Sequence, residues 1–134
     1  MIFNKKPYIA QEETTEIVVS LREDGIVHVF IKPGTHITVD VQKSMIETYY
    51  KVTNIKRPFI FEAGEFTSIS KEARQNATVI EDTAPVAASA IIVKNLGQRI
   101  IADYYYKFNK PKQPLKIFKR EEDAVIWLSD LFPN

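Results

Sequence analysis

The residues in this chain whose types could do chemistry are two histidines, two closely spaced serines and a run of tyrosines. His28 lies in a segment of alternating apolar and polar residues, and His36 follows Pro33-Gly34. A protein zinc site usually needs three or four ligands at regular spacing, and the sequence holds no HExxH or comparable group. We therefore predict no metal site. His28 is expected to be a strand residue that faces solvent or hydrogen-bonds to a neighbour.

Ser70, His28 and Asp103 supply the residue types of a hydrolase triad. A chain of this length offers many such triples, and no nucleophile elbow or glycine-rich oxyanion loop accompanies this one. The four glycines form no phosphate-binding pattern, and the absence of cysteine excludes thiolate chemistry. The sequence therefore predicts no catalytic residue, no cofactor and no enzymatic activity.

Ser68 and Ser70 precede a helical pattern that includes Arg74. A hydroxyl at a helix N-terminus could be modified or could contact a partner, because a phosphate is favourably placed there. Helix capping explains Ser70 completely, with Ser68 as a solvated loop residue, and we favour that interpretation. Ser68, Ser70 and Arg74 are kept as candidates for partner contact or modification.

Tyr104, Tyr105 and Tyr106 lie near several lysines at the end of another helical pattern. Aromatic residues with interleaved cations can bind single-stranded nucleic acid or an anionic head group. A helix that packs Tyr104 and Phe108 inward and places lysines at its C-terminus is a simpler explanation of the same residues. The net charge is only +1, so we do not expect a nucleic-acid partner. Tyr104, Tyr105 and Phe108 are also candidates for an apolar ligand pocket between this helix and the sheet.

The elements that must position these residues alternate between strands and helices within 134 residues, the length of one domain. Asp24-Gly25 predicts a tight hairpin between the first two strands, and helical connections predict parallel pairing of the others. The fold class is therefore α/β, with a mixed, mostly parallel five-stranded sheet and residues 1–12 as an N-terminal arm or short edge piece. The expected strands are 17–21, 26–31, 58–61, 86–93 and 114–118, and the expected helices begin after Thr38, after Ser70, after Asn95 and near Glu121.

Residues 86–93 are apolar except for Ser89, which predicts an interior strand covered on both faces. Right-handed crossovers would place the connecting helices on one face of the sheet. The second face must then be covered by a helix that crosses to it, by the N-terminal arm, or by a second subunit or an apolar ligand. We favour a homodimer. The inner stripes expected for the last two helices are Leu96, Ile100, Tyr104 and Phe108, and Ala124, Trp127, Leu128 and Leu131.

Two segments, PFIFEAGEFTSISKEAR and PLKIFKREEDAVIWL, carry a resemblance to a known family. Together with the element order, they resemble the STAS-type domain of the bacterial anti-sigma-factor antagonists, a fold that is also similar to the core of some lipid-binding domains. The layout is similar to a group of small uncharacterised bacterial STAS- and SEC14-like proteins. The resemblance spans most of the chain and implies a STAS-like fold.

In those antagonists, a serine within an Asp-Ser-Ser-Gly sequence at this helix start is phosphorylated and controls partner binding. Matching Ile69 to the family's aliphatic residue puts Ser70 at the aspartate position. Lys71, Glu72 and Ala73 then fill the Ser-Ser-Gly positions. The phosphoacceptor position is not a serine here, which argues against a phospho-switch of the family type.

Two functions remain open. The first is a non-catalytic protein–protein interaction or regulatory module that self-associates and contacts an unknown partner through residues 65–74. The alternative is a carrier of a small apolar or lipid-like ligand, which requires an apolar cavity of about 300 Å³ or more. The sequence shows no signal-peptide pattern and no apolar run long enough to cross a bilayer, so we expect a cytoplasmic protein.

Overall fold

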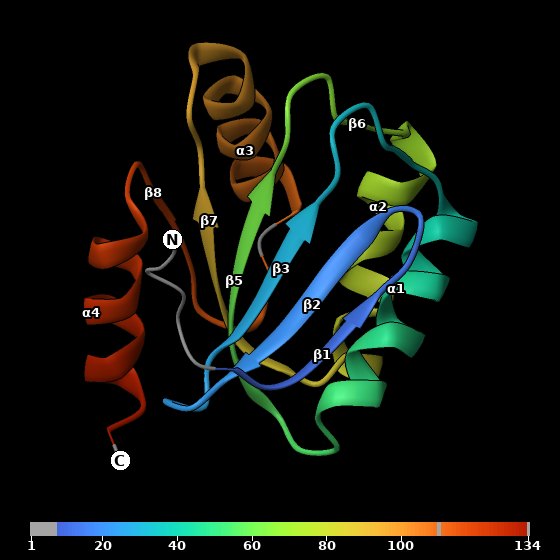
Figure 1. Ribbon diagram of the computed structural model, residues 1–134. Helices are drawn as coiled ribbons and strands as arrows, with labels where there is room; N and C mark the ends of the chain where they lie inside the picture. The colour runs from blue at the N-terminus through green and yellow to red at the C-terminus, as the bar shows by residue number, and fades with distance from the viewer. Residues whose placement is uncertain (1–7, 110, 134) are drawn as a thin grey trace.

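The computed structural model describes residues 8–109 and 111–133, with the backbone alone for residue 101 and residues 104–109. Antiparallel pairing joins the first three strands of its main sheet, and parallel pairing joins the rest. Six strands form that sheet, in the spatial order β1 (Tyr8–Glu13), β2 (Ile17–Arg22), β3 (Val27–Ile31), β5 (Arg57–Ala63), β7 (Val86–Ile92) and β8 (Leu115–Phe118) (Figure 1). Two short strands, β4 (His36–Ile37) and β6 (Ser68–Ile69), pair with each other outside it.

Three helices connect the parallel strands, and a fourth follows the last strand. They are α1 (Val39–Val52), α2 (Lys71–Val79), α3 (Leu96–Asn109) and α4 (Glu121–Leu131), with a 3₁₀ turn at Glu81–Thr83 after α2. Helices α1 to α3 share one face, because right-handed crossovers between neighbouring parallel strands return the chain on the same side. Helix α4 lies on the opposite face (Figure 1). A helix of the chain itself thus covers part of the second face, which is one of the three alternatives that the sequence leaves open.

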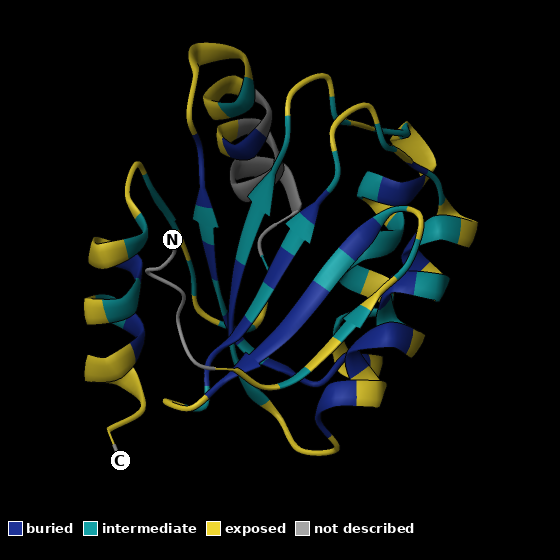
Figure 2. Cartoon of the chain, viewed as in Figure 1, coloured by how far each residue is buried: buried dark blue, intermediate teal, exposed yellow. Residues whose placement is uncertain are grey.

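The core has two parts, one on each face of the sheet (Figure 2). On the α1 side, the ring of Tyr49 meets the ring of Phe59 edge-on, with centroids 5.1 Å apart. Burial of Tyr49 raises the pKa of its hydroxyl well above the ordinary value, so the ring stays neutral. On the α4 side, Ile60 packs with Leu128. Successive residues of β5 are therefore buried on opposite faces, as the period of a strand requires.

Local sequence signals set the starts of three helices as predicted. The side chains of Thr38, Ser70 and Asn95 each accept a hydrogen bond from the backbone N–H three residues further on, at 3.2, 3.0 and 2.9 Å. These bonds satisfy donors that the first turn of a helix leaves without partners. Gly25 has a φ angle of +86° in the β2–β3 turn, a conformation that glycine adopts at little cost.

The interior position of β7 is confirmed. It lies between β5 and β8 and is parallel to both. Every second residue from Val86 to Ile92 is buried, and the intervening residues are half-buried, so both faces of the strand are covered. The predicted α/β class with a mixed, mostly parallel sheet is therefore correct.

The sheet has six strands where the sequence predicted five, because Tyr8–Glu13 pairs with β2 as an edge strand. The Gln11 amide donates a hydrogen bond to the Ser20 hydroxyl at 2.8 Å across this pair. The side chains of this strand are exposed or half-buried. Its sequence therefore shows little of the apolar alternation from which a strand is predicted. The part of the expected N-terminal arm from 1 to 7 lies outside the described residues.

The orientation of α3 is also different from the prediction. Leu96 and Ile100, expected in its inner stripe, are 74% and 59% exposed. Gln98 and Ala102 face the interior instead. The periodicity of a helix locates an apolar stripe but does not say which neighbour it meets. Leu131, expected in the inner stripe of α4, is likewise exposed.

Candidate functional site

A cavity of about 350 Å³ lies between the sheet and the face that carries α1, α2 and α3. Its wall is mostly aliphatic and aromatic. The sheet contributes Phe61 from β5, Ile91 from β7 and Leu115 from β8, and α1 contributes Met45. These residues leave an apolar space of the size that small-molecule sites have.

Several of the residues that line the cavity have short side chains. Ala63 and Ser89 line it from the sheet, while Ala77 and Ala102 line it from α2 and α3. None of these side chains reaches far enough to fill the space between a helix and a sheet. The large side chains at the start of α3 point outward instead, so they do not close the gap.

Hydrogen bonds between two crossover loops hold the end of the cavity near the carboxyl ends of β3 and β5. The N–H of Gly64 donates to the carbonyl of Ile31 at 2.8 Å, and β4 pairs with β6 just beyond. A Cβ at Gly64 would come within 2.8 Å of the Pro33 ring, so only glycine allows the loops to approach this closely. We call this end, formed by the β3–α1 and β5–α2 loops, the rim.

The structure brings the predicted contact residues Ser68, Ser70 and Arg74 together at the rim. Ser70 caps α2, as predicted from the sequence. The Ser68 hydroxyl lies 2.7 Å from Nδ1 of His36, and both side chains are exposed. Arg74 donates from Nη1 to the carbonyl of Ile69 at 3.1 Å. Ser68 and Arg74 also line the cavity.

The other predicted pocket residues cannot be placed in the same way. The side chains of Tyr104, Tyr105 and Phe108 lie outside the part of the chain that the structure describes. Their helix nevertheless covers the cavity, because Gln98 and Ala102 of α3 line it. The role of the three aromatic residues in a ligand pocket stays a prediction.

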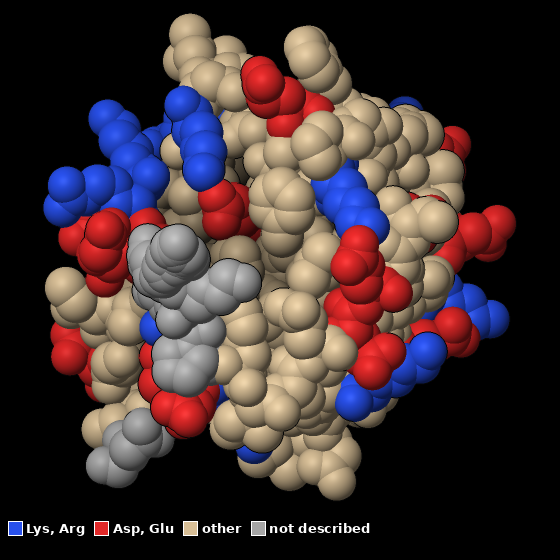
Figure 3. All heavy atoms as spheres, viewed as in Figure 1, with Lys and Arg blue, Asp and Glu red and all other residues tan. Residues whose placement is uncertain are grey.

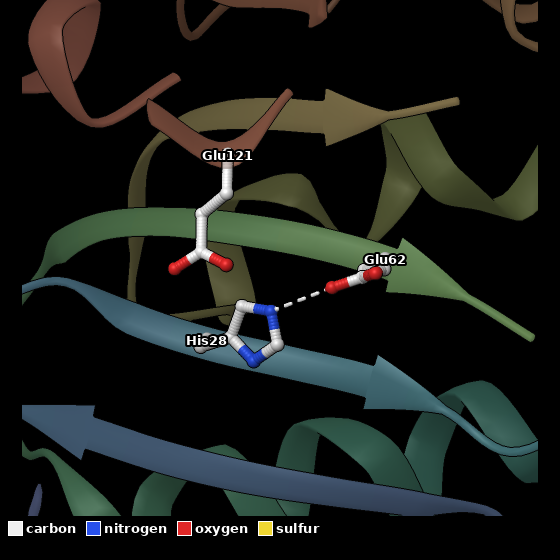
Figure 4. A group of neighbouring side chains, drawn as sticks. All are labelled: His28, Glu62 and Glu121. Atoms are coloured by element: carbon white, nitrogen blue, oxygen red, sulfur yellow. Dashed lines mark hydrogen bonds and ion pairs between the residues drawn. The ribbon is translucent and has the colours of Figure 1, made fainter. Parts of the chain in front are cut away.

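A polar cluster on the α4 face was not predicted. His28 on β3, Glu62 on β5 and Glu121 at the start of α4 point toward one another, with one potential ligand atom from each within 4.8 Å of the others (Figure 4). Nε2 of His28 lies 3.1 Å from Glu62, whose other oxygen is 2.5 Å from the Lys94 ammonium. Arg22 binds Glu121 at 2.8 Å. The side chains of Arg22 and Lys94 thus supply the positive charge that the two carboxylates need.

The cluster joins β2, β3 and β5 to the start of α4. The hydrogen bond from His28 is the largest cause that lowers the pKa of Glu62 to about 2, and Lys94 adds to it against the opposing effect of burial. His28 and Glu62 lie on adjacent strands two positions apart in register, which only the pairing of β3 with β5 reveals. The hydrogen-bonded neighbour expected for His28 is confirmed.

The possible triad is not assembled. Ser70 caps a helix on one face of the sheet, whereas His28 lies on the other face with Glu62. Asp103 pairs with Arg99 at 3.2 Å on α3. The three residues therefore cannot act on one substrate.

Charges of both signs are mixed on the face of the molecule shown in Figure 3. The basic side chains at the upper left of this view have acidic neighbours directly below them. Such mixing gives no extended field of one sign, consistent with the net charge of +1. Across residues 8–109 and 111–133, no helix combines the length and apolar character needed to cross a membrane.

Comparison with known proteins defines the family. A family model described as a domain of unknown function, DUF7793, matches residues 19–131. The chain belongs to this family. This DUF7793 chain is also similar to the crystal structure of an uncharacterised protein of the DUF3478 family with a SpoIIAA-like fold, from Shewanella loihica PV-4. The TM-score is 0.54 at 16% identity, covering 96% of this chain and 98% of that one.

A likeness at that identity shows the fold alone. The DUF7793 domain has a SpoIIAA-like, that is STAS-like, fold, and the resemblance seen in the sequence is confirmed. No curated protein matches the chain. Its function must therefore be argued from its own geometry.

Proposed function

We propose that this DUF7793 domain binds a small apolar ligand without catalysing a reaction on it. The observation that supports the proposal is the apolar cavity of about 350 Å³ between the sheet and α1 to α3. Ligand pockets start at about 300 Å³ and are lined mainly by apolar side chains with few polar groups. An apolar ligand would restore dispersion contacts that the lining side chains lack when the space is empty.

Two of the polar residues that line the cavity, Gln42 and Glu81, make bonds that hold the fold and not bonds suited to catalysis. Gln42 donates from its amide to the carbonyl of Ala73 at 2.7 Å and accepts from Asn76 at 3.2 Å. The Glu81 carboxylate accepts from the backbone N–H groups of residues 112 and 113, at 3.0 and 2.7 Å. Neither arrangement pairs a nucleophile with a base inside the cavity.

Binding is tested with N-phenyl-1-naphthylamine, a neutral dye whose fluorescence rises in apolar surroundings. We expect saturable binding of one dye per chain, with a dissociation constant in the micromolar range, and the same stoichiometry in native mass spectrometry. A detergent-free preparation that is folded by circular dichroism, yet shows no saturable signal, would contradict the proposal.

Self-association is the second candidate function, and an exposed apolar surface favours it. Phe66 is 88% exposed, and its φ of +61° is unusual for a residue that is not glycine. Leu96 and Ile100 are also exposed, and they lie at the start of α3. The loop after β5, which carries Phe66, and the start of α3 both lie at the upper end of the sheet in Figure 1. We propose that Phe66, Leu96 and Ile100 contact a second copy of the chain, because burying them would remove large apolar groups from water.

Sedimentation velocity over a hundredfold concentration range tests this second function. The wild type is expected to sediment faster as concentration rises, and Ile100→Ser is expected to shift that transition to higher concentration. Ile126→Ser is the matched control, because Ile126 on α4 is 60% exposed and Ile100 is 59% exposed. A sedimentation coefficient that stays constant at the monomer value would exclude self-association.

A further inference from the structure

The charges around the cavity indicate what kind of apolar molecule it fits. Among the described residues that line it, Glu62, Arg74 and Glu81 are charged. The Glu62 carboxylate bonds to His28 and Lys94 in the polar cluster of the α4 face. The Glu81 carboxylate accepts two backbone N–H groups from the segment before β8. Arg74 is thus the one cationic residue in the described lining.

Arg74 is positioned at the rim. It lies in the first turn of α2, and its bond from Nη1 to the Ile69 carbonyl, 3.1 Å long, holds the guanidinium against a residue that also lines the cavity. Its side chain is half-buried, so its charge is only partly surrounded by water. A guanidinium binds a carboxylate with two parallel N–H donors, which makes it selective for that group.

The cavity extends away from the rim as an apolar space. Its lining on β7 and just beyond runs from Val86 to Val93, and seven strand residues span about 20 Å. Ala84 and Val86, at the amino end of β7, line the end remote from the rim. A cation at one end of a long apolar wall is complementary to a molecule with an anionic head and an apolar chain.

We propose that the ligand is a single-chain aliphatic carboxylate whose head group is bound by Arg74 and whose chain lies along β5 and β7. This assignment rests on the proposed function, because it specifies the ligand class of the same cavity. The carboxylate would gain a charge-assisted pair of hydrogen bonds at the rim, and the chain would leave water. Arg74 is then the residue that selects the ligand by its charge.

Displacement of bound N-phenyl-1-naphthylamine by dodecanoate and by 1-dodecanol tests the assignment, with both competitors below the concentrations at which they aggregate. The two share a chain and differ in the charge of the head group. We expect dodecanoate to bind the wild type about tenfold more tightly than dodecanol, because hydrogen bonds to charged groups are the stronger kind. Arg74→Gln should weaken the binding of dodecanoate more than that of dodecanol, and so remove that preference.

Lys71→Gln is the matched control, since Lys71 is an exposed cation in the same helical turn that does not line the cavity. It should keep the full preference for dodecanoate. Equal affinity of the wild type for the acid and the alcohol would overturn the assignment, and this comparison needs no variant to fold. Undiminished preference in Arg74→Gln would overturn it as well. Failure of the neutral dye to bind is a separate result that would refute the proposed function itself.

Discussion

Replacing Ser89 with phenylalanine is expected to lower the affinity for N-phenyl-1-naphthylamine at least tenfold. Ser89 lies in the middle of β7, between Phe59 on β5 and Leu115 on β8, and its half-buried side chain lines the cavity. A phenylalanine ring at this position would occupy the space of the ligand. Aromatic residues are also favourable in strands, so the variant should fold.

The free energy of unfolding distinguishes occlusion of the cavity from damage to the fold. Ser89→Phe should keep the stability of the wild type or raise it by about 0.5–2 kcal/mol, as cavity-filling substitutions do. Ser129→Phe, the same substitution at an exposed position of α4, should leave dye affinity unchanged. Urea denaturation gives the stability, and fluorescence titration gives the affinity. Wild-type affinity in Ser89→Phe would mean that the dye binds elsewhere.

Protonation of Glu62 is expected to reduce stability in acid. The folded protein lowers the pKa of this carboxyl from 4.5 to about 2, first through the hydrogen bond from His28. Because the folded-state pKa lies below the unfolded one, the charged carboxylate stabilises the fold above pH 4.5, and that contribution is lost as the pH falls from 4.5 toward 2. Solvent screens part of it, so we expect a contribution of about 1–2 kcal/mol at neutral pH.

Glu62→Gln isolates this contribution, because the amide keeps the shape and cannot ionise. The variant should be less stable than the wild type by about 1–2 kcal/mol at neutral pH, and the difference should vanish near the folded-state pKa. Glu65→Gln, which removes an exposed carboxylate from the β5–β6 loop, should change little at either pH. The measurement is urea denaturation at several pH values. A stability difference between Glu62→Gln and the wild type that is absent at neutral pH, or that persists unchanged in acid, would show that the Glu62 carboxylate does not make this contribution.

The parts of the fold that could be predicted are those that local physics decides. The apolar run from Val86 to Ile92 predicts a strand that is covered on both faces, and β7 is covered on both. Caps at Thr38 and Ser70 follow from the donors that every helix start leaves open. Ser68, Ser70 and Arg74 surround such a start, so the sequence predicts them as candidates for partner contact. Their position at the rim of a cavity could not be foreseen, because it depends on how α2 and α3 pack.

The features that the sequence did not reveal depend on contacts between distant segments. Strand β1 has little apolar signal, because its side chains are exposed or half-buried and none is fully buried. The orientation of α3 depends on which side meets the sheet, and spacing by four residues does not contain that information. The meeting of His28, Glu62 and Glu121 needs both the strand register and the position of α4. The cavity is lined by residues of several separate elements, and no single segment of the sequence reveals that arrangement.

The hydrogen bonds between the two crossover loops have a mechanical consequence. The Gly64 N–H to Ile31 carbonyl bond and the pairing of β4 with β6 make one stiff frame out of segments that are far apart in the chain. Neither segment can swing away from α2 without breaking its bonds to the other. Movement of one loop at this end of the cavity would therefore carry the other loop with it.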